Sequence, residues 1–486
     1  FFFGLCGPSR SSSTVCLFEP TNGNEMDAGN GSHVSAPQTA AESDTPLQHD
    51  TVFLTGCTGF IGRLVLRKLL LAGAHVVVAI RGRRGQGATD RWLQMSQEDD
   101  AFCELPIERV QVIEADLLDP EFFESPVLEH VQTRITRIVH VAASVNMHET
   151  LETALTNNLL PGIRLYQWAQ KCPLCTHVVI TSTAFVSPPS DTPVPEEPCP
   201  AIQGVEVHQL ANLDSLPSFD EMKGYHQTTY TLSKAALEQY LANLHQREPA
   251  RFKLSFVRPS IVSVAVSDPY PGWNTSLDAL NGVIGLFATG LMTGKLVMDV
   301  PTRLNVVPVD YVAEVIVSAA YRSSNEDIRY VHAACEDDQK VCTEPLTHIV
   351  RDHGRKHYKS TWRKPSVRYT ASPGLWSKIK FNFFDVAPLA VVAALSPGKA
   401  GKTRKKTLGI LRNVYNTLIT NYGCRHYNFA SSSPPTFHID DYHHIITKGT
   451  HETLCKKGFI KKREPAEDGE GEKCVIQCFG SCTDAR

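Results

Sequence analysis

The 486-residue chain has little net charge: 48 lysines and arginines nearly balance 51 acidic residues, which gives −3 at pH 7. Proteins that bind nucleic acid through its phosphates carry a marked positive excess, so no nucleic-acid partner is expected. The first 50 residues contain no basic segment followed by a long apolar core, and a secretory signal is therefore not expected. Residues 1–49 are rich in serine, threonine, asparagine and glycine, and we predict that they are disordered.

Repeated cysteine pairs of the kind that bind zinc are also lacking. Cys172 and Cys175 have a metal-like spacing, but no second pair follows, so we interpret them as structural and predict no metal site. The other cysteines are scattered, which favours a reducing, intracellular setting. Three lie four residues apart near the C-terminus without a following histidine, and residues 456–486 are predicted to be a disordered tail. Lipidation of that tail is the alternative.

The most informative stretch is TVFLTGCTGFIG, residues 51–62. A buried strand is predicted to lead directly into glycines spaced G-x-x-G-x-x-G, and a leucine-rich helix over 63–73 follows. Strand, glycine turn and helix form a site at which backbone N–H groups and the helix N-terminus meet a dinucleotide pyrophosphate. A plain tight turn is the alternative. The predicted cofactor contacts in this stretch are Thr55, Gly56, Thr58, Gly59, Phe60, Ile61 and Gly62.

A second strand, predicted over 74–80, ends in a cluster of arginines. NAD-binding proteins often place an acidic residue here for the ribose 2′-hydroxyl, whereas arginines suit a 2′-phosphate. No acidic residue follows until Asp90, so we predict NADP rather than NAD, with Arg81 and Arg84 as the leading contacts. A solvated basic loop is the alternative.

Three more strands are predicted over 110–117, 138–145 and 177–184, with helices between them. This alternation predicts an α/β fold, a Rossmann-like doubly wound parallel sheet with ligands at the carboxyl ends of its strands. Asp116 and Leu117 are expected at the adenine edge, and the small Ala142 and Ala143 leave room for the cofactor. A helix over about 152–170 follows, and its Asn158 is a further predicted cofactor contact.

Tyr230 and Lys234 lie four residues apart at the start of a predicted helix, so both point from one face. A free phenol, with a pKa near ~10, donates a proton poorly at neutral pH, and a nearby ammonium lowers that pKa. Lys234 can also bind the nicotinamide ribose. A hydroxyl from Ser182 or Thr183 is expected to hold the substrate oxygen while Tyr230 protonates it. The alternative is a surface pair on an amphipathic helix.

The order of these motifs resembles the extended short-chain dehydrogenase/reductase superfamily, and more closely the fatty acyl-CoA reductases. The resemblance covers about residues 50–321 and rests on the runs VFLTGCTGFIG at 52–62, IRGRRGQ at 80–86, HVAASV at 140–145, TYTLSKAALEQ at 229–239, FVRPSIV at 256–262, DPYPGW at 268–273 and VVPVDYVAEVI at 306–316. Cys57, Pro161 and Thr228 depart from the family pattern.

The resemblance implies NADPH as cofactor and reduction of a long-chain fatty acyl-CoA to a fatty alcohol through an aldehyde. Tyr230 would be the proton donor, Thr183 the favoured hydroxyl and Lys234 the residue that orients the cofactor, while Pro259, Ser260 and Ile261 would line the nicotinamide. It also implies an NADP-binding reductase domain over 50–335 and a smaller, mainly helical C-terminal domain over 347–455. The alternatives are an NADP-dependent reductase or epimerase of another carbonyl substrate, such as a sterol or nucleotide sugar, and a non-catalytic NADP-binding scaffold.

Three further segments bear on substrate and membrane. The long insertion 187–224 is expected to form part of an acyl-chain entrance. The apolar segment 277–298 is either a substrate region or plain core. Residues 381–395 are apolar but shorter than the ~20 residues of a membrane span, and a basic cluster follows at 399–406. The segment alone slightly favours a buried helix followed by a solvated loop. The water-insoluble substrate that the resemblance implies leads us to expect peripheral association with a membrane instead, that of the endoplasmic reticulum or of the peroxisome.

Overall fold

The computed structural model describes residues 50–83, 85–147, 149–288, 295–297, 303–322, 325–359, 368–370, 387, 390–391 and 426–463. All of these belong to one compact unit. Arg84, residues 1–49 and most of the apolar and basic segments at 381–406 lie outside the described residues.

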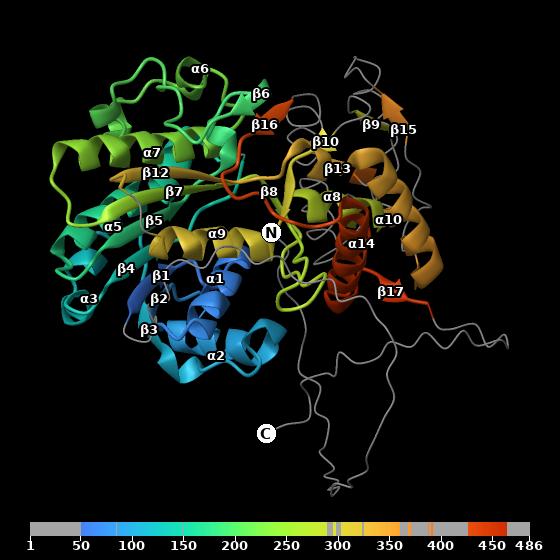
Figure 1. Cartoon of the computed structure of the whole chain (residues 1–486), viewed down its shortest axis with the longest axis horizontal. Helices are drawn as coiled ribbons and strands as arrows, with labels where there is room; N and C mark the ends of the chain where they lie inside the picture. The colour runs from blue at the N-terminus through green and yellow to red at the C-terminus, as the bar shows by residue number, and fades with distance from the viewer. Residues whose placement is uncertain are drawn as a thin grey trace, which may run out of the picture. The chain divides into compact units, whose positions relative to one another are not determined.

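A seven-stranded parallel sheet forms the centre of the unit (Figure 1). Its order across the sheet is β12 (Ile328–Ala333), β7 (Lys253–Pro259), β5 (His177–Thr181), β4 (Arg137–His140), β1 (Thr51–Thr55), β2 (His75–Ile80) and β3 (Val110–Glu114). The chain starts in the middle with β1, moves outward to β3, and returns to β4 on the other side of β1. This is the Rossmann-like order, and its switch point, where ligands bind, lies between β1 and β4. The predicted fold class is confirmed.

Both faces of the sheet are buried, which explains the continuous apolar runs of its strands. Phe53 packs into one core, with helices α3 (Pro126–Gln132), α5 (Leu160–Lys171) and α7 (Thr229–Arg247). Its neighbours Val52 and Leu54 point the opposite way, into a second core with α1 (Phe60–Leu71), α2 (Ala88–Glu98) and α9 (Val309–Tyr321). Successive side chains of a strand alternate between faces, so β1 holds the two layers together.

Several predicted elements are shorter than expected. Strands β3, β4 and β5 end at Glu114, His140 and Thr181, three to five residues before their predicted ends, because the following residues leave the sheet to form the loops of the site. The helix predicted over 152–170 is divided into α4 (Leu151–Asn158) and α5. Pro161 lies in the first turn of α5, where its missing N–H is tolerated, and so it ends one helix and begins the next.

The insertion 187–224 is not an open loop. It contains β6 (Ser190–Val194) and the short helix α6 (Phe219–Met222), and β6 pairs in parallel with β16 (Tyr427–Phe429) from the far end of the chain. The apolar segment 277–298 contributes α8 (Ala279–Ala288), whose Leu280 and Ile284 are buried in a core cluster. For these two side chains, the interpretation as plain core is therefore correct.

Helix α8 packs with α10 (Thr343–His357) and α14 (Ile439–Lys456) to form a smaller part beside the sheet (Figure 1). Short strand pairs complete it: β8 (Ile261–Ser263) with β11 (Val306–Pro308), β10 (Arg303–Leu304) with β13 (Val341–Cys342), β14 (Tyr358–Lys359) with β17 (Lys461–Lys462), and β9 (Lys295–Val297) with β15 (Arg368–Thr370). Residues 456–463, assigned to the tail from sequence, thus include the end of α14 and β17. The domain boundaries stay a prediction. Among the described helices, none combines the length and apolarity required to cross a bilayer.

Candidate active site

The glycine turn is held by close backbone contacts that admit no side chain. Gly56 has φ +78°, and a Cβ built on it would lie 2.5 Å from the backbone nitrogen of Ala142. A Cβ on Gly62 would lie 2.1 Å from the carbonyl oxygen of Gly56. Gly56 therefore permits the turn, and Gly62 lets α1 approach the strand. Gly59 stays exposed at the rim, where a ligand can reach its backbone.

The ends of β1 and β4 are joined by a buried hydrogen-bond network. The Thr55 hydroxyl lies 2.8 Å from Nδ1 of His140 and accepts a hydrogen bond from the backbone nitrogen of Ala142 at 3.3 Å. Burial, with a smaller contribution from the charge of Lys234, lowers the pKa of His140 to about 3, so its ring is neutral. Thr55 and Ala142 therefore fix the two loops that flank the switch point, and Ala143 next to them is exposed.

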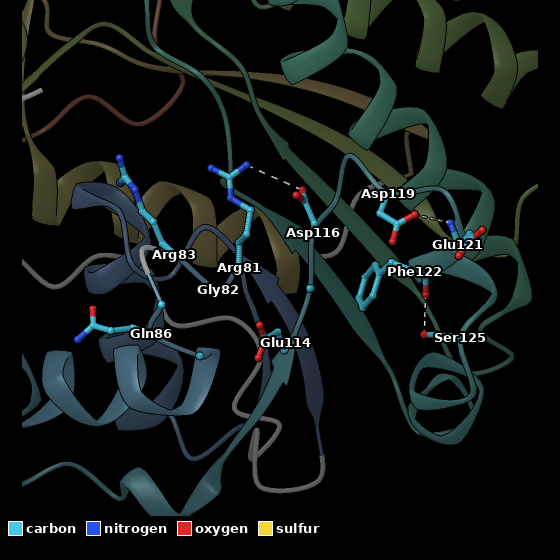
Figure 2. Close-up of a pocket in the computed structure, with 13 residues that line it drawn as sticks. Arg81, Gly82, Arg83, Gln86, Glu114, Asp116, Asp119, Glu121, Phe122 and Ser125 are labelled. Atoms are coloured by element: carbon cyan, nitrogen blue, oxygen red, sulfur yellow. Dashed lines mark hydrogen bonds and ion pairs between the residues drawn. The ribbon is translucent and has the colours of Figure 1, made fainter.

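A pocket of about 790 Å³ lies where β2 and β3 end (Figure 2). Arg81 and Asp116, expected at different parts of the cofactor, both line it, and Nη1 of Arg81 is 3.9 Å from Oδ1 of Asp116. Both side chains are largely exposed, so this ion pair is weak and can open for a ligand. Leu117 instead packs against the core.

Sequence reasoning missed Glu114 in this pocket. It is the last residue of β3, and its Oε2 accepts a hydrogen bond from the backbone nitrogen of Ala88 at 3.3 Å, at the start of α2. A Cβ on Gly82 would lie only 2.4 Å from Glu114 Oε1. An acidic group thus reaches the end of β2 from the neighbouring strand. The sequence could have indicated this, because Glu114 ends a predicted strand and parallel strands end at the same edge of a sheet.

Arg91 was also missed. It lies in α2 and donates a hydrogen bond to the carbonyl oxygen of Arg81. Burial lowers its pKa, and so does repulsion from Arg83, Arg81 and Arg63. These positive charges near the glycine turn favour the binding of an anion, because a bound phosphate would relieve their mutual repulsion.

Tyr230 lies in the first turn of α7, whose N-cap is the hydroxyl of Thr228. Burial raises the pKa of Tyr230 to about 12, and a hydrogen bond with the Thr183 hydroxyl acts in the opposite direction. Thr183 also donates to the carbonyl oxygen of Pro259 at 3.3 Å. The structure thus brings together the two residues predicted to hold the substrate oxygen.

Lys234, one turn further along α7, is almost completely buried, with 2% of its surface exposed. Its Nζ donates to the carbonyl oxygen of Thr181 at 2.8 Å. Burial lowers the pKa of Lys234 to about 8, against the opposing charge of Glu238. Glu238 in turn is bound by Arg258 of β7, through bonds of 3.0 Å and 3.2 Å from Nε and 2.5 Å from Nη2.

Three buried hydroxyls at the ends of adjacent strands have no hydrogen-bond partner within the described part of the chain: those of Thr181, Ser182 and Ser260. An unpartnered buried hydroxyl costs about 1–3 kcal/mol, and such groups are commonly satisfied by a ligand. Together with the glycine turn and the arginines, they fit a dinucleotide that runs along the strand ends and a polar substrate beside it. Pro259 and Ile261 lie next to Ser260 at the same edge, and their contact with the nicotinamide stays a prediction.

Asn158 serves the architecture of the site. Its Oδ1 accepts from the backbone nitrogen of Ser144 at 2.8 Å, and its Nδ2 donates to the hydroxyl of Ser233 at 2.9 Å and to the carbonyl oxygen of Ser144 at 3.1 Å. Ser233 in turn donates to the carbonyl oxygen of Tyr230 at 2.8 Å. Asn158 therefore ties the loop after β4 to the helix that carries Tyr230. Its direct contact with a cofactor stays a prediction.

Known proteins resemble this chain in sequence. A sequence model of an NAD-binding family, described as "Male sterility protein", matches residues 54–316. Fatty acyl-CoA reductase 1 of Gallus gallus is 28% identical over 354 residues, which cover 66% of this chain and 65% of that protein. Fatty acyl-CoA reductase 2 of Mus musculus is 28% identical over 345 residues, with coverage of 66% and 65%. The chain thus spans 65% of the length of these relatives.

Solved structures share the fold. The terminal R domain of the myxalamid biosynthetic pathway has a TM-score of 0.60 at 19% identity, covering 85% of this chain and 93% of that one. The reductase domain of a nonribosomal peptide synthetase from Mycobacterium tuberculosis has a TM-score of 0.55 at 16% identity, again covering 85% and 93%. The family model supports a nicotinamide cofactor, and the solved structures show the shared fold. The chain belongs to the male sterility family of NAD-binding proteins, with relatives named as fatty acyl-CoA reductases.

Proposed function

We propose that the protein is an NADPH-dependent reductase that converts a long-chain fatty acyl-CoA to a fatty alcohol through an aldehyde, with Tyr230 as the proton donor. The main support for this proposal is the hydrogen bond between Tyr230 and Thr183. It lies beside buried hydroxyls without partners, at the same edge of the sheet as the glycine turn. The names of the relatives supply the substrate class.

The cofactor supplies the hydride when it is bound. The chain's own residues must then hold the carbonyl oxygen and provide a proton to it. Once the Thr183 hydroxyl turns from the carbonyl oxygen of Pro259 towards the substrate, it and the Tyr230 hydroxyl form a pair of donors for the charge that develops on that oxygen, and Tyr230 transfers its proton. One reduction of the thioester releases CoA and leaves an aldehyde, and a second reduction gives the alcohol.

A phenol with a pKa of about 12 is a weak acid at neutral pH, so Tyr230 requires a nearby positive charge. Lys234 carries that charge on the same face of α7. In this structure Nζ of Lys234 donates to the carbonyl oxygen of Thr181, so it must turn towards Tyr230 and the ribose when ligands bind.

Purified protein with NADPH and acyl-CoAs of graded chain length tests the proposal directly, with cofactor absorbance and chromatography of products as readouts. Tyr230→Phe should lower turnover at least ~100-fold, as expected for loss of a general acid, without weakening cofactor binding. Tyr240→Phe, on the same helix, is the matched control and should stay active. Undiminished activity in Tyr230→Phe would refute the proton-donor role. Cofactor binding without turnover on any acyl-CoA would favour the scaffold, and turnover only on other carbonyl compounds would favour the other reductases.

The preference for NADPH rests on Arg81 and the cations around it. Glu114 and Asp116 in the same pocket oppose this preference, so the arginine charge must outweigh theirs. Arg81→Ala should raise the KM for NADPH about tenfold, or ~1.4 kcal/mol, and leave that for NADH unchanged. Arg247→Ala, an exposed arginine at the end of α7, is the control. Equal use of NADH and NADPH by the wild-type protein would contradict the assignment.

Peripheral membrane association and an intracellular location remain proposals. Flotation of the protein with anionic vesicles tests the first, and loss of binding on removal of the basic cluster at 399–406 is the expected result.

A further inference from the structure

The run Asp-Pro-Tyr-Pro-Gly-Trp at 268–273, one of the runs on which the family resemblance rests, has no role in the chemistry above. It lies in the segment 265–276, here called the strap. Asp310 of α9, 4% exposed, fixes the start of the strap. Its carboxylate accepts hydrogen bonds from the backbone nitrogens of Val266, Ser267 and Asp268 at 3.0, 2.8 and 2.9 Å. The strap is thus an ordered element of the fold.

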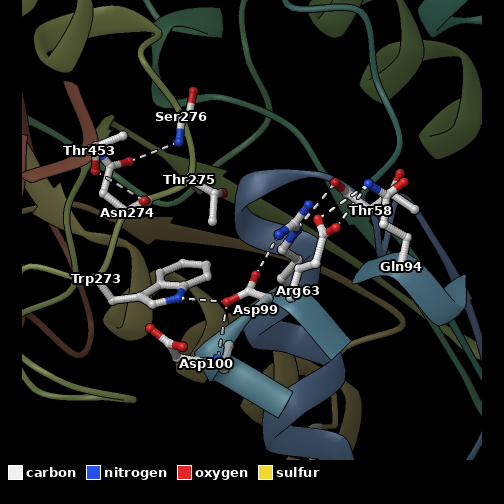
Figure 3. Close-up of polar contacts among 12 residues, drawn as sticks. Thr58, Arg63, Gln94, Asp99, Asp100, Trp273, Asn274, Thr275, Ser276 and Thr453 are labelled. Carbon is white, nitrogen blue, oxygen red and sulfur yellow. Dashed lines mark hydrogen bonds and ion pairs between the residues drawn. The ribbon is translucent and has the colours of Figure 1, made fainter. Parts of the chain in front are cut away.

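Trp273 of the strap reaches the glycine turn. Its ring is 2% exposed and lies parallel to that of Phe60, with 5.6 Å between ring centroids and 12° between ring planes. Its Nε1 donates to Oδ1 of Asp99 at 3.0 Å (Figure 3). Phe60 is the first residue of α1, directly after Gly59, so the indole packs against the end of the turn.

Asp99 extends the contact to the other side of the turn. Its Oδ2 lies 2.5 Å from Nη1 of Arg63, and its Oδ1 also accepts from the backbone nitrogen of Ala101 at 3.0 Å. Arg63 in turn donates from Nε to the carbonyl oxygen of Thr58, at 3.5 Å, within the glycine turn (Figure 3). The carboxylate thus holds both an indole from the strap and a guanidinium from α1.

We propose that Trp273, Asp99 and Arg63 form a brace that holds the glycine turn in its dinucleotide-binding geometry, with Trp273 and Asp99 as positioning residues. The inference rests on cofactor binding at the turn. Gly56 and Gly62 are held by close backbone contacts, whereas Thr58 and Gly59 are partly or fully exposed, so this part of the turn is the less closely held. A turn that is already ordered loses less conformational freedom when the cofactor binds, and affinity rises accordingly. The brace acts on cofactor affinity and leaves proton transfer at Tyr230 unchanged.

Calorimetric titration of the full chain with NADPH tests the brace. Trp273→Phe keeps an aromatic ring against Phe60 but removes the N–H donor and part of the indole, so the Kd should rise about fivefold, equivalent to ~1 kcal/mol. Asp99→Asn should raise it about tenfold, because a neutral amide cannot form the ion pair with Arg63, although its oxygen can still accept from Trp273. The kcat at saturating cofactor and the KM for acyl-CoA should not change.

Tyr166→Phe is the control for a purely structural effect, because it removes hydrogen bonds of the phenol that are remote from the turn, with His245 at 2.9 Å and with Gln170. It should lower the midpoint of thermal unfolding as Trp273→Phe does and leave the Kd unchanged. An unchanged Kd in both Trp273→Phe and Asp99→Asn, with normal binding by the wild type, overturns the brace alone. An effect of Tyr166→Phe on Kd as large as that of Trp273→Phe also overturns it. Failure of the wild type to bind NADPH and NADH overturns both the brace and the proposed function.

Discussion

Gly449→Ala is a sharp test of how the C-terminal helices pack against the strap. Gly449 lies within α14, and a Cβ built on it would lie 2.2 Å from the carbonyl oxygen of Gly272, 2.7 Å from its Cα and 2.9 Å from its carbonyl carbon. All three are backbone atoms, so no rotation of a side chain can relieve the contact. Gly272 has φ +89°, a conformation that glycine adopts readily, so glycine is needed on both sides of this contact.

Two effects of this substitution oppose each other. Alanine is favoured over glycine within a helix by about 1 kcal/mol, so helix propensity alone predicts a more stable protein. Overpacking of a tight contact costs about 1–3 kcal/mol. The displaced strap would also lose hydrogen bonds from Thr453 to the carbonyl oxygen of Asn274, at 3.2 Å, and from Lys457 to that of Thr275, at 3.1 Å. We expect a net loss of about 2 kcal/mol, since a further ~1 kcal/mol for the lost bonds offsets the gain in propensity.

Urea unfolding followed by circular dichroism measures this difference. Gly285→Ala in α8 is the matched control, because its Cβ would meet only the end of the Leu454 side chain, at 3.3 Å. That variant should be as stable as the wild type or slightly more so. If Gly449→Ala were as stable as the wild type, close contact between α14 and the strap would not exist in solution.

Three further predictions concern charge. Glu238→Gln should lower the free energy of unfolding, measured in urea, by about 3 kcal/mol, because it leaves the buried charge of Arg258 without an opposite charge. A decrease below about 1 kcal/mol would contradict this. Burial lowers the pKa of His140 to about 3 and of His226 to about 4, so both stay neutral in the folded protein while the unfolded chain takes up protons below about 6.5. The free energy of unfolding should therefore fall as the pH decreases from 6.5 towards 4, by up to ~1.4 kcal/mol per pH unit for each ring, and a flat profile there would refute it. With the pKa of Lys234 at about 8, kcat/KM should fall as the pH rises through 8, and a rate that is constant up to pH 10 would exclude a role for its charge.

Sequence reasoning worked where local pattern determines structure. The glycine turn requires a strand before it and a helix after it, and both are legible in the order of apolar residues and glycines. The conformation of Gly56 and the approach of Gly62 to its carbonyl follow from residue type at that spacing. Tyr230 and Lys234 are one helical turn apart, so their placement on one face also follows. Strand ends were less accurate, because a strand and the loop that extends it have the same apolar pattern.

What sequence reasoning could not supply are contacts between distant elements. Glu114 reaches the end of β2 only because β3 lies beside it. The pairing of β6 with β16 joins segments more than 200 residues apart. β16 has only three residues, and the sequence SDTPV of β6 lacks the apolar pattern of a strand. Long-range strand pairing depends on the whole topology, which the local apolar pattern does not encode. The hydrogen bond between Trp273 and Asp99 has the same origin.

The charges beneath the site explain how Lys234 acquires its lowered pKa. Glu238 lies one turn beyond Lys234 on α7, and its charge raises the pKa of Lys234, but less than burial lowers it. Arg258 binds both carboxylate oxygens of Glu238, and this pair is almost completely buried. Because Glu238 is bound directly to Arg258, burial dominates the pKa of Lys234 and brings it to about 8. At neutral pH most of the lysine is then charged, and its Nζ donates to the carbonyl oxygen of Thr181 at 2.8 Å. The structural ion pair thus keeps Glu238 on Arg258, separate from the cation that we propose to act on Tyr230.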